Sequence, residues 1–173
     1  MKYVSTRDNS KDYSFEDVFI KGLADDGGLY VPKSLKKYNS EELSKLKNLS
    51  YNELSTDIIN QFSSDFISKD ELSSLVKKSY SAFREKEVVK ISSIKDLKLL
   101  ELFHGPTLAF KDVAMQFIGN LYEYYLSKND KKLNIVVATS GDTGAAAIDA
   151  IKGKSNLNIF VLHPNNKISS VQR

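Results

Sequence analysis

The feature that most constrains the fold is a pair of short apolar runs separated by a glycine-containing loop and an alanine-rich segment. Residues 134–139 read NIVVAT, and residues 158–163 read NIFVLH. Short, continuously apolar runs are typical of strands buried in a parallel sheet. The segment between them is expected to be a helix that ends at Gly153, because glycine readily adopts the left-handed conformation after a helix. Strand, loop, helix and strand make one βαβ unit, so this half of the chain predicts an α/β fold.

The sheet predicted around this unit is narrow. Residues 88–94 and 97–103 are also expected to be strands, and a long helix is expected over about 107–127, after the chain-breaking sequence HGP. Only two strands are then of the parallel type, whereas a parallel sheet needs cover on both faces and is rarely so narrow. Residues 169–173 look like the opening of another helix. We therefore expect the α/β domain to be incomplete within these 173 residues.

The first half of the chain predicts mainly helices. Three start signals, in which a serine is followed three residues later by an acidic residue, stand at Ser14, Ser50 and Ser68. Apolar and aromatic side chains follow at helical spacing, and we interpret them as core. Residues 26–28 are expected to form a turn and residues 29–32 a short extended run. These patterns predict a small, mainly helical N-terminal domain, 1–83, followed by the first part of an α/β domain, 84–173.

Composition excludes several classes of chemistry. The chain has 25 Lys and Arg against 22 Asp and Glu, a net charge of +3 that is too small and too scattered to indicate a nucleic-acid partner. With no cysteine and two histidines, disulfides, thiolate zinc sites and cysteine nucleophiles are excluded, and no metal site is expected. We find neither a secretory signal pattern nor a run of about 18 apolar residues. We therefore expect a cytoplasmic protein without membrane association, and the sequence does not predict its oligomeric state.

Lys111 has an unusual place on the predicted helix 107–127. At about 100° per residue it falls among the apolar side chains, whereas Asp112 falls on the polar side with Gln116 and Asn120. The periodicity leaves two interpretations open. A lysine in the first turn can extend past its neighbours to reach solvent. Alternatively, the amine lies in a partly desolvated site, where burial favours the neutral form that makes a Schiff base or acts as a base.

The loop 139–144, TSGDTG, joins the first apolar run to the alanine-rich helix. Ligands of open α/β sheets bind at the carboxyl ends of strands, where backbone N–H groups and the hydroxyls of Ser140 and Thr143 would suit a carboxylate or phosphate. A plain helix cap with a tight turn explains the same residues equally well. The dinucleotide, P-loop and nucleophile-elbow motifs do not match this sequence. His104 and His163 are interpreted as structural.

Two motifs together carry a resemblance to a known family. They are LELFHGPTLAFKD at 100–112 and ATSGDTGAA at 138–146, with supporting matches at Gly22-Leu23, 26–32 and Lys167-Ile168-Ser169. With these motifs the chain resembles the threonine synthase family. Its members are pyridoxal-phosphate enzymes of fold type II, which is also called the tryptophan synthase β-like group. The resemblance extends over all 173 residues. It implies a small helical domain followed by the start of an open parallel-sheet domain.

The resemblance also implies roles for particular residues. Lys111 would carry pyridoxal 5′-phosphate as an aldimine, which favours the desolvated amine, and would then move protons between substrate carbons. The residues that would face the substrate carboxylate and the hydroxyl side of the cofactor ring are Ser140, Gly141, Asp142, Thr143 and Gly144. Among these, Asp142 is expected to bind the cofactor as well as the substrate. The implied reaction converts O-phospho-L-homoserine and water to L-threonine and phosphate.

The family pattern is incomplete in this chain. Asn166 stands where some members have glycine. The later glycine-rich loop that holds the cofactor phosphate, and the polar residue that contacts the pyridine nitrogen, have no counterpart in these 173 residues. We therefore expect the N-terminal portion of a threonine synthase, partial or inactive by itself. The alternative is a stand-alone, non-catalytic remnant that acts as a partner-binding module.

Overall fold

A computed structural model describes residues 1–165 and 167 of the chain. The chain forms two compact units, Met1–Ser74 and Leu75–Arg173, and the division between them falls inside a helix. The domain ranges expected from the sequence, 1–83 and 84–173, stay predictions. The expected turn at Asn166 and the expected helix opening at 169–173 lie outside the described residues.

The first unit combines a two-stranded antiparallel sheet with helices. Its elements are β1 (Tyr3–Ser5), α1 (Phe15–Lys21), β2 (Tyr30–Pro32), α2 (Ser40–Leu46), α3 (Tyr51–Ser63) and most of α4 (Lys69–Tyr80). The predicted helix starts are confirmed, because α1, α3 and α4 begin directly after Ser14, Ser50 and Ser68. Two elements were not predicted: β1, which pairs with the distant β2, and α2, which begins with a capping box between Asn39 and Glu42.

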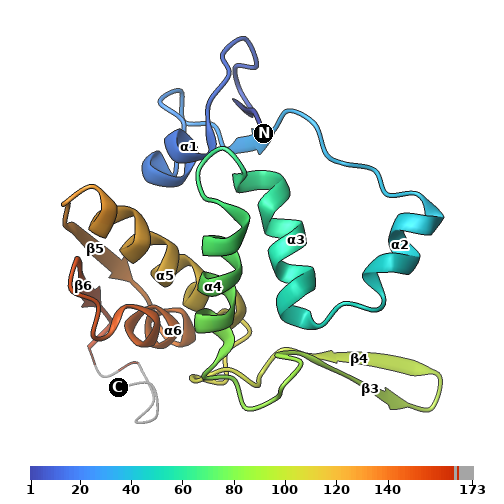
Figure 1. Ribbon diagram of the computed structural model, residues 1–173. Coiled ribbons are helices and arrows are strands. Elements are labelled where there is room, and N and C mark those ends of the chain that lie inside the picture. The colour runs from blue at the N-terminus through green and yellow to red at the C-terminus, as the bar shows by residue number, and fades with distance from the viewer. Residues whose placement is uncertain (166, 168–173) are drawn as a thin grey trace. The chain divides into compact units, whose positions relative to one another are not determined.

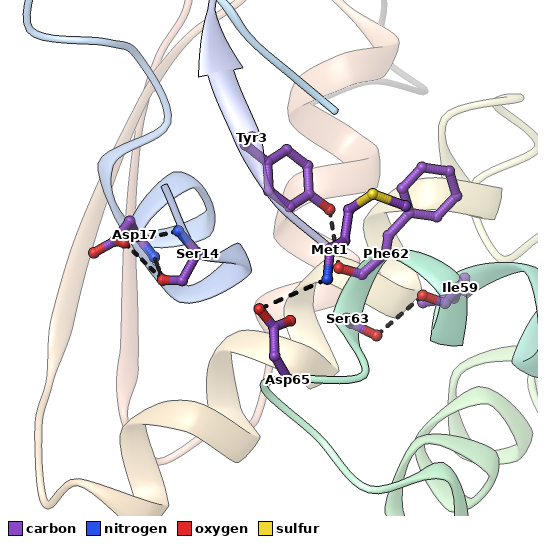
Figure 2. A network of polar contacts seen from close by, with 8 residues as sticks. All are labelled: Met1, Tyr3, Ser14, Asp17, Ile59, Phe62, Ser63 and Asp65. Atoms are coloured by element: carbon purple, nitrogen blue, oxygen red, sulfur yellow. Dashed lines mark hydrogen bonds and ion pairs between the residues drawn. The ribbon is translucent and has the colours of Figure 1, made fainter. Parts of the chain in front are cut away.

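Aromatic rings and a few polar contacts hold the first unit together. The rings that meet, with centroids 5.3 to 6.2 Å apart, are those of Tyr3, Phe15, Phe19 and Phe66. The Tyr3 hydroxyl donates to the Phe62 carbonyl at 3.0 Å, and the Met1 amine lies 3.9 Å from the Asp65 carboxylate (Figure 2). Burial raises the pKa of Tyr3 to about 12, and the nearby Asp65 charge adds to the effect. These contacts tie the N-terminus and β1 to the end of α3.

The second unit contains the predicted βαβ unit. After the end of α4 come β3 (Lys90–Ile94), β4 (Leu97–Glu101), α5 (Asp112–Lys128), β5 (Leu133–Ala138), α6 (Asp142–Ile151) and β6 (Leu157–Leu162). The strands β3 and β4 form an antiparallel hairpin, whereas β5 pairs in parallel with β6, with Leu133 opposite Leu157. The helices α5 and α6 pack against one another beside this strand pair (Figure 1). The chain is therefore a mixed α/β structure, as its sequence predicts.

One face of the β5–β6 pair is covered in the described part of the chain. Ile135 and Val137 lie beneath the two helices, where a depression of about 230 Å³ is lined by residues of α5, α6 and β5. On the opposite face, Val136 is 66% exposed and Phe160 56% exposed. The burial expected for both apolar runs therefore holds for one face only, because α5 and α6 cover the same side of the strands.

Helix α5 differs from the predicted helix at its start and in its faces. It begins at Asp112, and residues 107–111 form turns. Asp112 and Asn120, both expected on a polar face, are 0% and 6% exposed. The Asn120 amide donates to the Ser79 hydroxyl, at the end of α4, at 3.0 Å. Helix α5 is thus covered on two sides, by the end of α4 and by α6, whereas the angular count assumed one covered side.

Candidate functional site

The segment between β4 and α5 brings Lys111 to the start of a helix. The Gly105 carbonyl accepts a hydrogen bond from the Leu108 N–H at 3.2 Å, which closes a turn. Leu108 has a φ of +64°, in the left-handed region that costs a residue with a side chain about 1 kcal/mol or more. Lys111 is the N-cap residue of α5, and its carbonyl accepts from the Met115 N–H at 2.8 Å. The lysine side chain therefore extends from backbone that the first helical turn fixes.

Asp112 closes this segment into a loop. Its carboxylate accepts from the Thr107 N–H at 2.8 Å through Oδ2, and from the Thr107 hydroxyl at 2.6 Å through Oδ1. A Cβ on Gly105 would lie 2.4 Å from both Cβ and Oδ2 of Asp112, so glycine leaves the room that this buried carboxylate needs. The prediction that Asp112 points to a polar helix face is wrong, because the side chain turns back onto the residues that precede the helix.

Lys111 and Asp142, two predicted site residues 31 positions apart, lie together. The Lys111 Nζ donates to Asp142 Oδ2 at 2.8 Å and lies 4.3 Å from the centre of the Phe110 ring. The lysine side chain is 25% exposed and the aspartate side chain 53%. The hydrogen bond from Lys111 lowers the pKa of Asp142, and the lysine charge adds to the effect. The amine is thus held between a carboxylate and an aromatic ring, not extended into open solvent.

An apolar depression of about 320 Å³ lies at this lysine. It is lined by Leu102, Phe110, Lys111, Val113, Ala114 and Met115. Apart from Lys111, the lining side chains are apolar. The depression therefore offers apolar contact surface next to a primary amine.

The loop between β5 and α6 is organised by Thr139, which was not among the predicted binding residues. Its hydroxyl accepts from the N–H groups of Gly141 and Gly144, each at 3.3 Å. A Cβ on Gly144 would lie 2.4 Å from Thr139 Cγ2. Because Gly141 stands at the N-cap and has no side chain, the Thr139 hydroxyl caps α6 in its place. A threonine two residues before a glycine N-cap is the sequence signal that could have indicated this role.

The two hydroxyls predicted to bind an anion have different surroundings. Ser140 is exposed, whereas Thr143 is half-buried and lines the depression between α5, α6 and β5. The capping interpretation of this loop is confirmed by the Thr139 hydrogen bonds. Anion binding by the loop stays a prediction.

His104 lies in the segment before α5 but pairs away from Lys111. Its Nε2 is 3.0 Å from Glu101 Oε2, and its carbonyl accepts from the Arg84 N–H at 2.9 Å. A hydrogen bond from Ser92, followed by the one from His104, lowers the pKa of Glu101. These contacts give His104 a structural role, because they join the segment after β4 to Glu101 and Arg84.

The candidate chemistry of the described residues rests on few groups. In the part of the chain that the structure covers, no group of three or more His, Asp and Glu side chains could hold a metal ion. None of the helices described above is both long and apolar enough to cross a membrane. The groups that come together are a lysine amine, a carboxylate and a capped helix start at the carboxyl end of a parallel strand. They define an α/β protein with a candidate ligand site at that strand end and a primary amine as its candidate reactive group.

Comparisons with known proteins show what this chain is similar to. A family profile described as the threonine synthase N terminus matches residues 2–80. The threonine synthase of Schizosaccharomyces pombe is 44% identical over 99% of this chain and 35% of its own length. Threonine synthase-like 2 of Pongo abelii is 40% identical over 99% of this chain and 36% of its own length. The crystal structure of threonine synthase from Brucella melitensis with PLP bound superimposes with a TM-score of 0.94 and 42% identity, over 99% of this chain and 37% of that chain.

By sequence and by fold, the chain corresponds to the N-terminal portion of threonine synthases. The resemblance predicted from its two motifs is thereby confirmed. The chain spans 35% to 37% of the length of the relatives named here. Because the match extends over 99% of this chain, it includes the segments that contain Lys111 and Asp142.

Proposed function

We propose that this chain is the N-terminal part of a pyridoxal-phosphate-dependent threonine synthase, which converts O-phospho-L-homoserine and water to L-threonine and phosphate. The observation that carries the proposal is the 2.8 Å hydrogen bond between Lys111 Nζ and Asp142 Oδ2. It joins the two sequence motifs in one site through Lys111 and Asp142, which lie 31 positions apart. The proposal is supported by relatives that are threonine synthases, one of them solved with PLP bound.

The residues present suit pyridoxal 5′-phosphate. This cofactor binds through a primary amine, and Lys111 presents one on a side chain that is 25% exposed. The apolar depression of about 320 Å³ beside it would accept the cofactor ring, and Asp142 would hold the amine in place until the ring arrives. When bound, the cofactor would supply an electron sink for carbanions formed on the substrate.

The chain's own residues would bind the substrate and move protons. The Lys111 amine would transfer protons at substrate carbons, since a positioned amine can act as both acid and base. The residues that would contact the substrate carboxylate, partly through N–H groups at the start of α6, are Ser140, Gly141, Asp142, Thr143 and Gly144. Asp142 would also face the hydroxyl side of the cofactor ring. The apolar side chains around Lys111 would limit the access of water to the amine.

We expect the 173 residues by themselves to bind the cofactor weakly and to show no turnover. They span 37% of the PLP-bound relative, and the glycine-rich loop expected to hold the cofactor phosphate is not among them. The alternative, a non-catalytic partner-binding module, is compatible with the match to a protein named threonine synthase-like 2. The pairing of Lys111 with Asp142 favours the enzyme, because a module of that kind has no need of a half-buried amine.

The test is the release of phosphate and threonine from O-phospho-L-homoserine by the protein made from the complete gene, with pyridoxal phosphate present. We expect turnover in the unmodified protein and its loss in Lys111→Ala. Lys132→Ala is the matched control, because this exposed lysine precedes β5 and lies outside both motifs. Turnover that survives Lys111→Ala would contradict the assignment of the amine. A complete protein that shows no turnover with excess substrate and cofactor would favour the partner-binding module.

A further inference from the structure

We propose that Thr107 and Asp112 form a clamp that positions Lys111 for its reaction with the cofactor aldehyde, an inference that rests on the proposed function. The clamp consists of two hydrogen bonds to the Asp112 carboxylate, from the Thr107 N–H at 2.8 Å and from the Thr107 hydroxyl at 2.6 Å. Lys111 directly precedes Asp112 in the chain. The clamp therefore fixes the backbone from which the reactive amine extends.

Burial makes the clamp difficult to open. Asp112 is 0% exposed, and each of its carboxylate oxygens accepts one of the two hydrogen bonds from Thr107. A buried carboxylate that loses its donors is strongly destabilising, because no water replaces them. Breaking either bond would leave part of this carboxylate without a partner. The residues from 107 to 112 are thus held as a closed loop.

The loop that the clamp closes contains unfavourable backbone. Leu108 has a φ of +64°, a conformation that a leucine adopts only when its surroundings impose it. Gly105 passes so close to Asp112 that a Cβ there would lie 2.4 Å from Oδ2. The strained leucine and the crowded glycine both lie just before Lys111. We infer that the clamp supplies the restraint that keeps this segment in its observed conformation.

The clamp acts on the Lys111 amine through the backbone. Lys111 is the N-cap of α5 and, among the described residues, makes no side-chain capping bond, so its own side chain does not secure the helix start. Asp112 secures it instead, and a carboxylate in the first helical turn is also favoured by the helix dipole. With the start of α5 fixed, the Lys111 Nζ reaches Asp142 at 2.8 Å. Thr107 and Asp112 are therefore positioning residues for Lys111.

The test measures where pyridoxal phosphate attaches. The protein made from the complete gene is incubated with excess pyridoxal phosphate and reduced with borohydride, and the pyridoxyl adducts at Lys111 and at exposed Lys132 are quantified by peptide mass spectrometry. We expect the Lys111 to Lys132 ratio to fall about tenfold in Thr107→Val, which loses a hydrogen bond to a carboxylate, and to stay within about twofold in Thr107→Ser, which keeps it. Hydrogen exchange at the amide of residue 107 should accelerate in the valine variant only.

Each outcome bears on the proposal. The clamp would be overturned by an unchanged ratio in a Thr107→Val chain whose circular dichroism matches that of the unmodified chain. It would also be overturned if the ratio fell as far in Thr107→Ser as in Thr107→Val. If Thr107→Val does not fold, Asp112→Asn replaces it, since the amide keeps the shape and one acceptor oxygen; a fall in the ratio supports the clamp, and an unchanged ratio overturns it. If Lys111 in the unmodified chain is labelled no more than Lys132, the proposed function fails and the clamp fails with it, a result distinct from failure of the clamp alone.

Discussion

The two units differ in how they place backbone in the left-handed region. In the first unit Gly22 and Gly27 have positive φ, at +73° and +75°. In the second unit the residues with side chains at positive φ are Val88, Lys95, Leu108 and Asp130. Such positions cost about 1 kcal/mol or more each, so they persist only where the surrounding structure imposes them. The comparison indicates that the first unit is built from locally favourable choices, whereas the second stores strain, some of it three residues before Lys111.

Polar contacts of short and of long reach occur in the chain. In the first unit, Ser14 and Ser50 cap helices by bonding to residues three positions away. In the second unit, the Asn120 amide bonds to Ser79, 41 positions away, and the Lys154 amine bonds to Asn120 Oδ1 at 2.7 Å, 34 positions away. Contacts of the second kind depend on tertiary packing. The first unit has such contacts too, since the Tyr3 hydroxyl bonds to the Phe62 carbonyl 59 positions away, so local rules leave part of each unit undescribed.

Alanine at two glycines should produce the largest contrast between the units. We expect Gly105→Ala to destabilise the chain by about 3 kcal/mol, because its Cβ would lie 2.4 Å from buried Asp112. Gly22→Ala is the control: its φ is +73° but nothing lies within 4 Å of its Cβ, so we expect a loss of about 1 kcal/mol. Urea denaturation measures both free energies of unfolding. Equal losses would contradict the crowding described around Asp112.

Two half-exposed leucines give the next contrast. Leu43, inside α2, is 50% exposed, and Leu108, with its φ of +64°, is 52% exposed. Leu43→Gly should lose about 1 kcal/mol of helix propensity. Leu108→Gly should be neutral or stabilising by up to about 1 kcal/mol, because glycine adopts the left-handed conformation freely. A loss at Leu108 as large as that at Leu43 would show that its side chain, not its backbone, dominates there.

Helix caps offer a smaller contrast. Ser50→Ala, which removes the N-cap of α3, should cost about 1 kcal/mol, and so should Thr139→Val, which removes the hydroxyl that caps α6. Ser140→Ala is the control beside it and should change stability by less than about 0.5 kcal/mol, because this serine is exposed. Thermal unfolding of the three variants measures the differences. If Ser140→Ala costs as much as Thr139→Val, the cap of α6 is misassigned.

The smallest expected effect is a pH dependence at Lys154. Burial lowers the pKa of this lysine below its ordinary 10.5, and the nearby Lys78 charge adds to the effect. The unfolded chain therefore binds more protons at this site in the window just below 10.5, so the contribution of Lys154 to stability rises with pH there. The stability of the unmodified chain minus that of Lys154→Met should increase between about pH 8 and about pH 10.

Lys21 in the first unit is the opposite case. Its hydrogen bond to Asp25 raises its pKa, so its contribution to stability is present below the unfolded-state pKa and falls as pH rises above it. The difference between the unmodified chain and Lys21→Met should therefore decrease with pH. If the stability difference changes with pH in the same direction for both lysines, the contrast between a half-buried amine and an exposed ion pair is wrong.

The sequence predicted features set by local patterns and missed those that depend on tertiary packing. The caps at Ser14 and Ser50 could be predicted because both partners of each cap lie within one helical turn. The βαβ unit could be predicted from its two apolar runs. Asp112 was misplaced because an angular count assumes that a helix begins where its apolar repeat begins and is covered on one side. Thr139 was missed because its role depends on the turn that brings Gly144 over it. The hydrogen bond between Lys111 and Asp142 was not predicted: the family resemblance implied only that both residues would contact the cofactor.

We propose that Lys111 is the amine that carries the cofactor. Its most direct test is borohydride reduction of the protein made from the complete gene, with one equivalent of pyridoxal phosphate, followed by peptide mapping of the adduct. We predict a single dominant pyridoxyl adduct at Lys111 that disappears in Lys111→Arg without moving to another lysine. A dominant adduct on a different lysine, such as half-buried Lys154, would contradict the claim.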